Sequence, residues 1–477
     1  MKVCEKKKLI VYGCLFIFGM VFLMFLSRET GYYLQNDSKG YIELGNRHGV
    51  MPLYPLFLYL LRSIFGVERY LFCAVIIQTL FAICSSVILL DYLCETFVLN
   101  TIECVVCYFG LLLLFNIDYI FSGITHQILT EGLAYPVFYI YILFLLKSIN
   151  DKWLPNTVVH SLLACILSLI RSQMKMMIVL SAVVALYYWA KRWIVEKDVK
   201  HLGRAVISSL GVVVLTLLIC AGADRILQNL TGSIVAKNVI QSEQSADTPQ
   251  TLDAPVKHSI NQAFDLFDGK ILYTAQKDDV QLFDNDEIKE LYSIMYQAME
   301  ENECLPRYAQ TGLNRWRSML AFNNCAKVCR EAYEQYQSGD EDVIIYTDAM
   351  NIILPTLARK HWPMMIKHMS VFFSHGLMCS VCFENEEHLA LCYIVTVLSL
   401  ICAVCTIALR LRQKDSDKKD IEIFILIIVL MLMLNAMVSI PLFTIRRYVC
   451  YFIGIYYAML FICVRNWAVN AGIIKRK

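Results

Sequence analysis

The sequence predicts an all-α polytopic membrane protein with about ten transmembrane helices and a small, mainly helical extracytoplasmic domain. Hydrophobic residues make up 58% of the 477 positions and charged residues only 18%, and the mean hydropathy is +0.53. Many apolar residues fall in runs long enough to cross a bilayer, which takes ~20 helical residues. Lys and Arg gather between these runs, as they do in cytoplasmic loops. A net charge of +2 gives no indication of a nucleic-acid partner.

The first apolar run, Leu9–Leu26, follows three lysines, Lys6 to Lys8, and has no small-residue cleavage site behind it. We therefore expect a retained signal anchor whose N-terminus is cytoplasmic and whose following loop, residues 27–69, is outside. Within this loop Pro52–Phe65 is too short to span. It is expected to lie along the outer interface.

The length of the apolar segment Pro155–Trp189 shows how the middle of the chain crosses the membrane. Pro155–Trp189 as one helix would be about 50 Å long, which exceeds a ~30 Å hydrocarbon core. We therefore predict a helical hairpin that turns at Arg171–Lys175. Nine crossings are expected after the anchor. The hairpin supplies two of them, and the other seven are Tyr70–Leu90, Val98–Phe115, Ile128–Lys147, Gly203–Ala221, Leu389–Leu411, Ile421–Ile440 and Tyr448–Val464. Both termini are then cytoplasmic.

One large polar region interrupts the apolar pattern, and it divides the chain into three parts. Residues 1–222 form an N-terminal transmembrane module, 223–362 an extracytoplasmic domain and 363–477 a C-terminal membrane module. Gln241–Pro255 has the composition of a linker, and Asp286–Gln337 has the periodicity of one or two amphipathic helices. Trp362–Val381 is expected on the outer surface, because spanning would reverse the following basic loop.

Most of the 19 cysteines lie inside apolar runs, as Cys104 and Cys107 do, where they act as small hydrophobes. No disulfide framework is therefore predicted. Cys379 and Cys382 form a CxxC motif outside the runs, but a metal site would need a second ligand pair nearby.

This topology places a set of charged and aromatic residues on the outer face. They are Asp37, Tyr41, Glu43, Arg47 and His48 of the first loop, Glu131 at the start of the fourth crossing, Arg171 and Lys175 of the hairpin turn, and Arg446, Arg447 and Tyr448 before the last crossing. Snorkelling to head groups explains any single basic residue. As a set, carboxylates and guanidiniums at one face suit an anionic lipid-phosphate ligand and a base.

Four segments resemble the GT-C superfamily of integral-membrane glycosyltransferases, which includes protein mannosyltransferases and aminoarabinose transferases. The first loop has an Asp followed by Tyr and a Pro-Tyr-Pro-Leu-like segment, NDSKGY and MPLYPLFLYLL. Thr130-Glu131 opens a long apolar run, LLACILSLIRSQMKMMIVL has an Arg before a new helix, and TIRRYVCYFIGIYYAML has an Arg-Tyr before the last crossing. Their order and spacing cover nearly the whole chain outside the polar domain.

The resemblance implies roles for these residues. Asp37 would be the general base, with Glu43 or Glu131 as a second carboxylate. The donor phosphate would be held by Arg171, Lys175, Arg446 and Arg447, and the substrates by Tyr41, Arg47, His48 and Tyr448. Many family members have two adjacent acids in the first loop, whereas Ser38 follows Asp37 here. No metal ligands are therefore assigned, and a divalent metal is left open.

The same chemistry follows from the residue types: a carboxylate deprotonates an acceptor, and Arg stabilises a departing phosphate. We expect transfer of a sugar from a polyprenyl-phosphate donor to a glycolipid, polysaccharide or protein, at the outer face of the plasma (inner) membrane. Two alternatives stay open: a flippase or transporter for a lipid-linked saccharide, and a polysaccharide polymerase or ligase. Tyr41, Tyr54 and Tyr59 also fit an interfacial aromatic belt.

Overall fold

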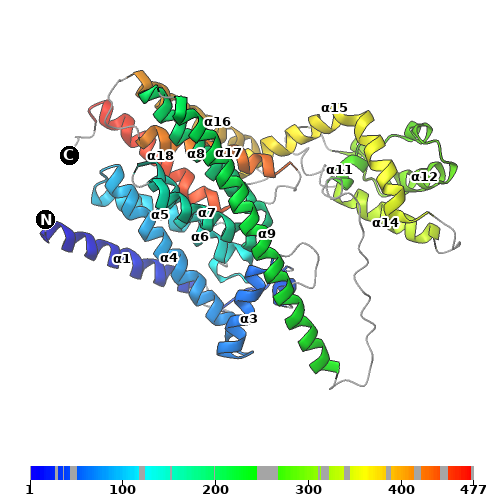
Figure 1. Cartoon of the computed structure of the whole chain (residues 1–477), viewed down its shortest axis with the longest axis horizontal. Coiled ribbons are helices and arrows are strands. Elements are labelled where there is room, and N and C mark those ends of the chain that lie inside the picture. Colours follow the sequence, from blue (N-terminus) through cyan, green and yellow to red (C-terminus); the bar gives the residue numbers. More distant parts are fainter. Residues whose placement is uncertain are drawn as a thin grey trace. The chain divides into compact units, whose positions relative to one another are not determined.

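The computed structural model describes the chain as helices and connecting turns (Figure 1). The residues it describes are 2–26, 31–35, 37–42, 51–117, 124–150, 153–197, 199–243, 267–309, 312, 322–337, 344–382, 388–412, 420–440 and 450–473. No strand occurs among them, and a single isolated β-bridge joins Tyr33 to Gln127. The protein is an all-α polytopic membrane protein, as predicted.

The chain divides into two compact units. The first comprises Met1–Pro249, Leu398–Met431 and Cys450–Lys477, and the second comprises Gln250–Val397 and Leu432–Val449. The part of the chain up to Pro249 contains the helices α1 (Lys2–Leu26), α2 (Ser38–Ile42), α3 (Leu53–Phe65), α4 (Tyr70–Thr96), α5 (Thr101–Ile117), η1 (Ile124–His126), α6 (Thr130–Asn150), α7 (Trp153–Ile170), η2 (Ser172–Lys175), α8 (Met176–Glu196) and α9 (Val199–Glu243). Those that follow are α11 (Asp268–Leu272), η3 (Lys277–Leu282), α12 (Asp286–Glu301), η4 (Pro306–Tyr308), α14 (Phe322–Gln337), α15 (Tyr346–Val381), α16 (Leu389–Arg412), α17 (Asp420–Val438) and α18 (Cys450–Asn470).

Eight helices of the described chain are long and apolar enough to cross a membrane. They correspond to eight of the ten predicted crossings. The other two, Leu9–Leu26 and Val98–Phe115, coincide with α1 and α5, whose apolar stretches are shorter. The helix α3 has 13 residues and is too short to span, as predicted for Pro52–Phe65.

The predicted hairpin turn is confirmed. The helix α7 ends at Ile170, the backbone of Arg171 is extended with φ −154° and ψ 125°, and α8 begins at Met176. The central helix of the first unit is α6, which packs on α4 and α7. The apolar part of α6 is 72% buried within the protein, against 12% for that of α9, so α6 lies in the core of the unit and α9 at its periphery.

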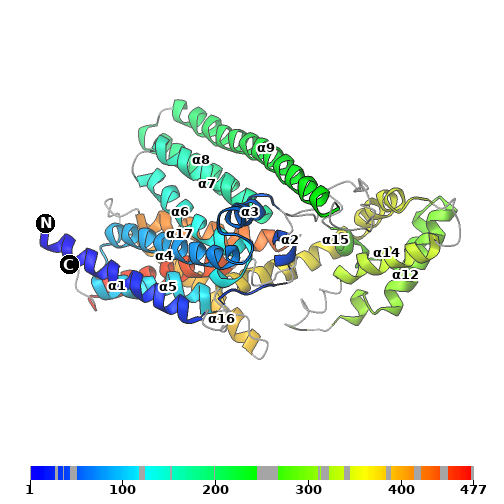
Figure 2. The ribbon, with the colours of Figure 1, turned by 90° about the horizontal axis from the view of Figure 1, so that it is seen from below.

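Two helices continue past the predicted domain boundaries. The helix α9 does not end near Ala221 but continues to Glu243, so its 45 residues extend beyond the crossing (Figures 1 and 2). At 1.5 Å per residue it is about 67 Å long. The helix α15 runs through Trp362 without a break and contains both Pro355 and Pro363. Lengths of apolar runs mark where a helix leaves the bilayer, but not where its backbone hydrogen bonding stops.

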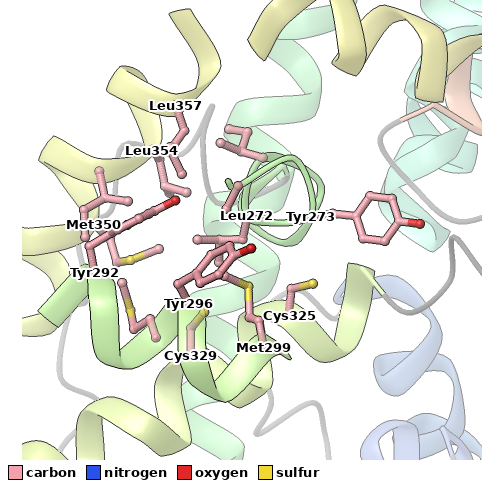
Figure 3. Packing of buried hydrophobic residues seen from close by; sticks show 14 of the residues in the cluster. Leu272, Tyr273, Tyr292, Tyr296, Met299, Cys325, Cys329, Met350, Leu354 and Leu357 are labelled. Carbon is pink, nitrogen blue, oxygen red and sulfur yellow. The ribbon is translucent and has the colours of Figure 1, made fainter. Parts of the chain in front are cut away.

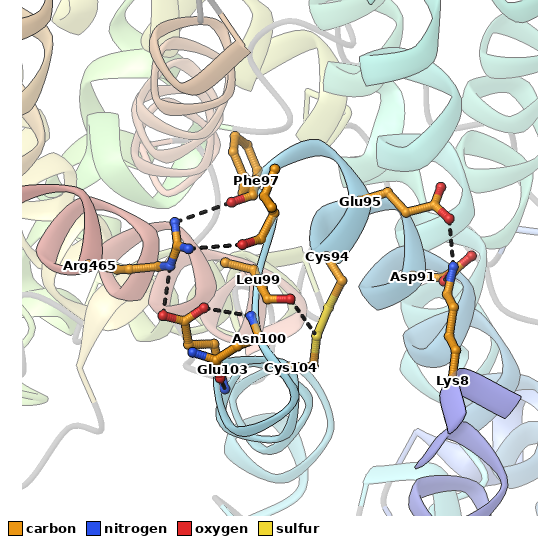
Figure 4. Close-up of a disulfide and its surroundings, with 11 residues drawn as sticks. Lys8, Asp91, Cys94, Glu95, Phe97, Leu99, Asn100, Glu103, Cys104 and Arg465 are labelled. Carbon is orange, nitrogen blue, oxygen red and sulfur yellow. Dashed lines mark hydrogen bonds and ion pairs between the residues drawn. A yellow bond between two sulfur atoms is a disulfide. The ribbon is translucent and has the colours of Figure 1, made fainter. Parts of the chain in front are cut away.

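A disulfide joins Cys94, in the last turn of α4, to Cys104 in α5 (Figure 4). The prediction that Cys104 acts only as a buried hydrophobe is therefore wrong. Leu99 and Asn100 turn the chain between the two helices, which brings the cysteines together. Cys379 and Cys382 are buried and are not joined to each other: the thiol of Cys379 lies 3.4 Å from His375 Nε2, and that of Cys382 donates to the carbonyl of Cys392 at 3.3 Å.

The second unit has its own hydrophobic core (Figure 3). The helix α12 presents Ile288, Leu291, Tyr292, Met295 and Met299 at helical spacing, and all of them are buried. Cysteines of α14 and the N-terminal half of α15 close this core. Both α12 and α14 lie within Asp286–Gln337, where the sequence predicts amphipathic helices.

A buried carboxylate fastens η3 to α15 in the second unit. Asp279 is 0% exposed and accepts hydrogen bonds from Lys360 Nζ at 2.6 Å and His361 Nε2 at 2.8 Å. The hydroxyl of Tyr292 and the backbone N–H of Gln276 also donate to it, at 3.3 and 2.8 Å. Burial acts to raise the pKa of Asp279, but these hydrogen bonds outweigh it and hold the pKa below its usual value.

Candidate functional site

The first loop is docked on the segment that leads into α6. The N–H of Tyr33 donates to the carbonyl of His126 at 2.9 Å, and the N–H of Ile128 donates back to the carbonyl of Tyr33 at 3.0 Å. The hydroxyl of Ser38 donates to the carbonyl of Ile128 at 2.9 Å. These bonds place Asp37, the half-buried residue before α2, close to the start of α6.

Aromatic side chains support the first loop by packing against each other. The ring of Tyr41 packs edge-to-face on Tyr54, with centroids 5.4 Å apart. The Tyr54 hydroxyl accepts a hydrogen bond from Gln78 Nε2 of α4 at 2.8 Å. Tyr54 and Gln78 are both 0% exposed. The interpretation of Tyr54 as an aromatic of the membrane interface is therefore wrong, because it lies in the core under the loop.

The site contains a buried ion pair between Arg171 and Glu131. Arg171 Nη1 lies 2.5 Å from Glu131 Oε1, and the side chains are 10% and 4% exposed. The Thr130 hydroxyl donates to Glu131 Oε2 at 3.0 Å and accepts from Arg171 Nη1 at 3.4 Å. Glu131 is in the first turn of α6, where the helix dipole favours a negative charge. Removing one partner would leave a buried charge uncompensated.

Tyr41 links the loop to the ion pair. Burial raises the pKa of its hydroxyl, the charge of Glu131 raises it further, and Arg171 acts in the opposite direction. A hydrogen bond with Thr130 lowers this pKa and the charge of Asp37 raises it, so all four groups lie within electrostatic range of one phenol. The structure thus brings together Asp37, Tyr41, Glu131 and Arg171, which the sequence assigns to one site.

Of the remaining predicted site residues, the structure describes only Lys175, which is not in this cluster. Lys175 lies in η2 and is exposed, and it makes no ion pair with any residue that the structure describes. Glu43, Arg47, His48, Arg446, Arg447 and Tyr448 lie outside the described residues. Within those ranges no group of three or more His, Cys, Asp or Glu side chains is placed to hold a metal ion.

Several residues of the site had no clear signal in the sequence. Gln78 and Tyr54 support the loop from within apolar stretches that the sequence analysis gave no site role, whereas Thr130, which contacts the ion pair, belongs to the Thr130-Glu131 motif. Gly132 is also part of this packing, since a Cβ there would lie 2.4 Å from Gln78 Oε1.

A second polar cluster lies at the other end of α4. Lys8 bridges Asp91 at 2.5 Å and Glu95 at 2.6 Å. Asp91 and Glu95 also line an open cavity of about 450 Å³ together with Lys147. Beside it Arg465 of α18 holds the turn between α4 and α5 through Glu103 and two backbone carbonyls (Figure 4). Glu103 therefore serves helix packing here.

Comparisons with protein-family models, with characterised proteins and with solved structures found no match to this chain. The chemistry of the site is therefore argued from its own residues.

Proposed function

We propose that this protein is a membrane glycosyltransferase that moves a sugar from a polyprenyl-phosphate donor to an acceptor hydroxyl. The observation that carries the proposal is the meeting of three separate segments: the first loop with Asp37, the start of α6 with Glu131, and the hairpin turn with Arg171. These segments include three of the four that resemble the GT-C superfamily. The fourth, with Arg446 and Arg447, lies outside the described residues.

The proposed reaction assigns one task to each side of the site. Asp37 takes the proton of the acceptor hydroxyl, whose oxygen then bonds to the anomeric carbon of the sugar. The bond from that carbon to the phosphate oxygen breaks, and the lipid phosphate leaves with the electron pair. Arg171 stabilises the charge on the leaving phosphate. Because no covalent sugar–enzyme bond forms, the anomeric configuration is inverted.

Glu131 has a positioning role in this scheme. Its carboxylate holds the Arg171 guanidinium at 2.5 Å in a site where both side chains are almost fully buried. A buried, paired Glu is a poor proton acceptor for a substrate, and Asp37 is the more exposed of the two carboxylates. The base is therefore assigned to Asp37.

The proposed orientation places this site on the extracytoplasmic side of the plasma membrane, with both termini inside. The support is the distribution of Lys and Arg over independent loops. Single cysteines at exposed positions near the site, such as Lys175→Cys, would be labelled by a membrane-impermeant maleimide added to intact cells. Labelling only after permeabilisation would contradict the orientation.

The test of function uses the full-length protein in nanodiscs and a panel of short-chain polyprenyl-phosphate sugars. The readout is polyprenyl phosphate released in the presence of membrane extract as acceptor source. We expect release with at least one donor. Asp37→Asn keeps the size of the side chain and removes the base, so it should lower the rate at least ~100-fold while donor binding persists.

Two results would redirect the proposal. Near-normal turnover of Asp37→Asn would exclude Asp37 as the base. Movement of a fluorescent lipid-linked saccharide across proteoliposomes, without release of polyprenyl phosphate and unaffected by Asp37→Asn, would favour the flippase alternative.

A further inference from the structure

The open cavity near Lys8 lies at one end of α6, and the ion pair of Arg171 and Glu131 lies at the other end. Glu131 is in the first turn of this helix, whereas Lys147, which lines the cavity, is in its last turn. The 21 residues of α6 span about 30 Å. The cavity has a volume of about 450 Å³, within the range of about 300–1,000 Å³ of ligand pockets. It is therefore large enough for a ligand of its own, away from the proposed catalytic site.

The cavity is lined by charged groups of both signs that the protein does not join to each other. Asp91 and Glu95 share the ammonium of Lys8, which lies 2.5 Å from Asp91 Oδ1 and 2.6 Å from Glu95 Oε1 (Figure 4). Glu95 Oε2 accepts no hydrogen bond within the described part of the chain. The ammonium of Lys147 lies 5.7 Å from the ring centroid of Tyr92 and forms no ion pair with any residue that the structure describes. A carboxylate oxygen and an ammonium are thus left to a ligand.

The lining changes from apolar to charged along both helices. Ile88 precedes Asp91 on α4, and Leu143 precedes Lys147 by one turn on α6. Both helices are long and apolar enough to span a membrane, and the charged residues lie close to their ends. The apolar residues therefore lie toward the hydrocarbon core and the charges toward the head groups. Ile88 is 48% exposed, so an acyl chain can pack against it. This order of polarity matches a lipid.

We propose that the cavity binds the head group of a phospholipid that carries a primary amine, of the phosphatidylethanolamine class. Lys147 pairs with the lipid phosphate, and the lipid ammonium donates to Glu95 Oε2. The charges of Lys8, Lys147, Asp91 and Glu95 sum to zero, so a ligand with a net charge would leave one charge without compensation. A choline head group has no N–H to donate, and a glycerol head group has no cation. The proposal depends neither on the proposed orientation nor on the proposed reaction.

The first test uses the full-length wild-type protein in detergent, freed of co-purified lipid. Phosphatidylethanolamine, phosphatidylcholine and phosphatidylglycerol with the same acyl chains are added in equal amounts, and native mass spectrometry measures each bound lipid. We expect retention of phosphatidylethanolamine to exceed that of the other two ~10-fold, as the loss of one charge-assisted hydrogen bond predicts. Equal retention of the three, or a preference for phosphatidylglycerol, would overturn the proposal.

Two substitutions separate the two contacts. Glu95→Gln keeps the size of the side chain and removes its charge, so it should lower binding of phosphatidylethanolamine ~10-fold and leave phosphatidylglycerol unaffected. Lys147→Gln should weaken both lipids, because both carry the phosphate. The matched control is Arg62→Gln in the last turn of α3, an exposed charge that does not line the cavity. Wild-type preference in both cavity variants would place the bound lipid elsewhere and overturn the proposal.

Glycerophosphoethanolamine distinguishes a lipid from a soluble ligand, because it has the same charges and no acyl chains. At the same concentration it should not displace phosphatidylethanolamine, since it makes no contact with Ile88. Displacement at equal concentration would overturn the assignment to a lipid and indicate a soluble phosphate ester with a primary amine.

Discussion

The two polar clusters of the membrane unit contain the same kind of ion pair and use it differently. The side chain of Arg465 is 20% exposed and contacts the turn between α4 and α5 through three nitrogens. Nε pairs with Glu103, Nη1 donates to the carbonyl of Phe97, and Nη2 donates to the carbonyl of Val98. Arg171 is 10% exposed and reaches both Glu131 and Thr130 through one nitrogen, Nη1. Tyr41 is within electrostatic range of this arginine and of a second carboxylate, Asp37. The first arginine fastens helices, whereas the second is placed under a loop that carries a candidate base.

The largest expected difference is in the response to Lys. Arg171→Lys keeps the charge but loses the planar fork that binds two phosphate oxygens, so sugar transfer should fall ~100-fold or more. The matched variant Arg465→Lys should keep most of the transfer rate per folded molecule. Both are compared at equal protein level in the membrane. Full activity of Arg171→Lys would make Arg171 a packing residue like Arg465 and move the donor phosphate to Arg446 or Arg447.

Acid should loosen the attachment of the first loop to the segment at His126. Burial lowers the pKa of His126 to about 4, from an ordinary value near 6.5. Between these values the unfolded state binds more protons than the folded one. The contribution of neutral His126 to the free energy of unfolding is therefore fully present above about pH 6.5. It is lost as the pH falls toward 4, and the loss is at most about 3 kcal/mol.

The measurement is hydrogen exchange at the amides of Tyr33 and Ile128, which join the first loop to the segment at His126. Their protection should fall between pH 6.5 and pH 4.5, and His126→Asn should remove most of that change. An unchanged acid response in His126→Asn would exclude the imidazole as its cause.

Arg465→Ala should act on stability. It leaves Glu103, whose side chain is 9% exposed, without its cation and two carbonyls without donors. We expect a loss of about 2 kcal/mol in the free energy of unfolding. Thermal melting of the protein in nanodiscs, followed by tryptophan fluorescence, measures it. An unchanged melting temperature would show that the α4–α5 turn holds without Arg465.

The smallest effect is expected at Lys8. Its ammonium bridges two carboxylates, but Lys8, Asp91 and Glu95 are 35%, 39% and 66% exposed in their side chains, so water and salt screen the pair. Lys8→Ala should cost at most about 1 kcal/mol, and less at high salt. A loss as large as that of Arg465→Ala would mean that α1 depends on this contact for its position.

Length and charge bias predicted the helices and the Arg171 turn, because a bilayer restricts the length of an apolar helix. They also placed Asp37, Glu131 and Arg171 at one face. They did not show that Glu131 binds Arg171 directly, because that contact depends on how α6 and α7 pack. For the same reason Tyr54 was assigned to the interface instead of the core, and Cys104 to a hydrophobic run instead of a disulfide.

The packing of Gln78, Tyr54 and Tyr41 depends on the absence of a side chain at Gly132. A methyl group there would lie 2.4 Å from the amide oxygen of Gln78. Gln78 in turn holds the hydroxyl of Tyr54, on whose ring Tyr41 rests. In genetic terms, position 132 would behave as part of the site without carrying a functional group. Inactivating alleles would then map to a residue that never meets a substrate.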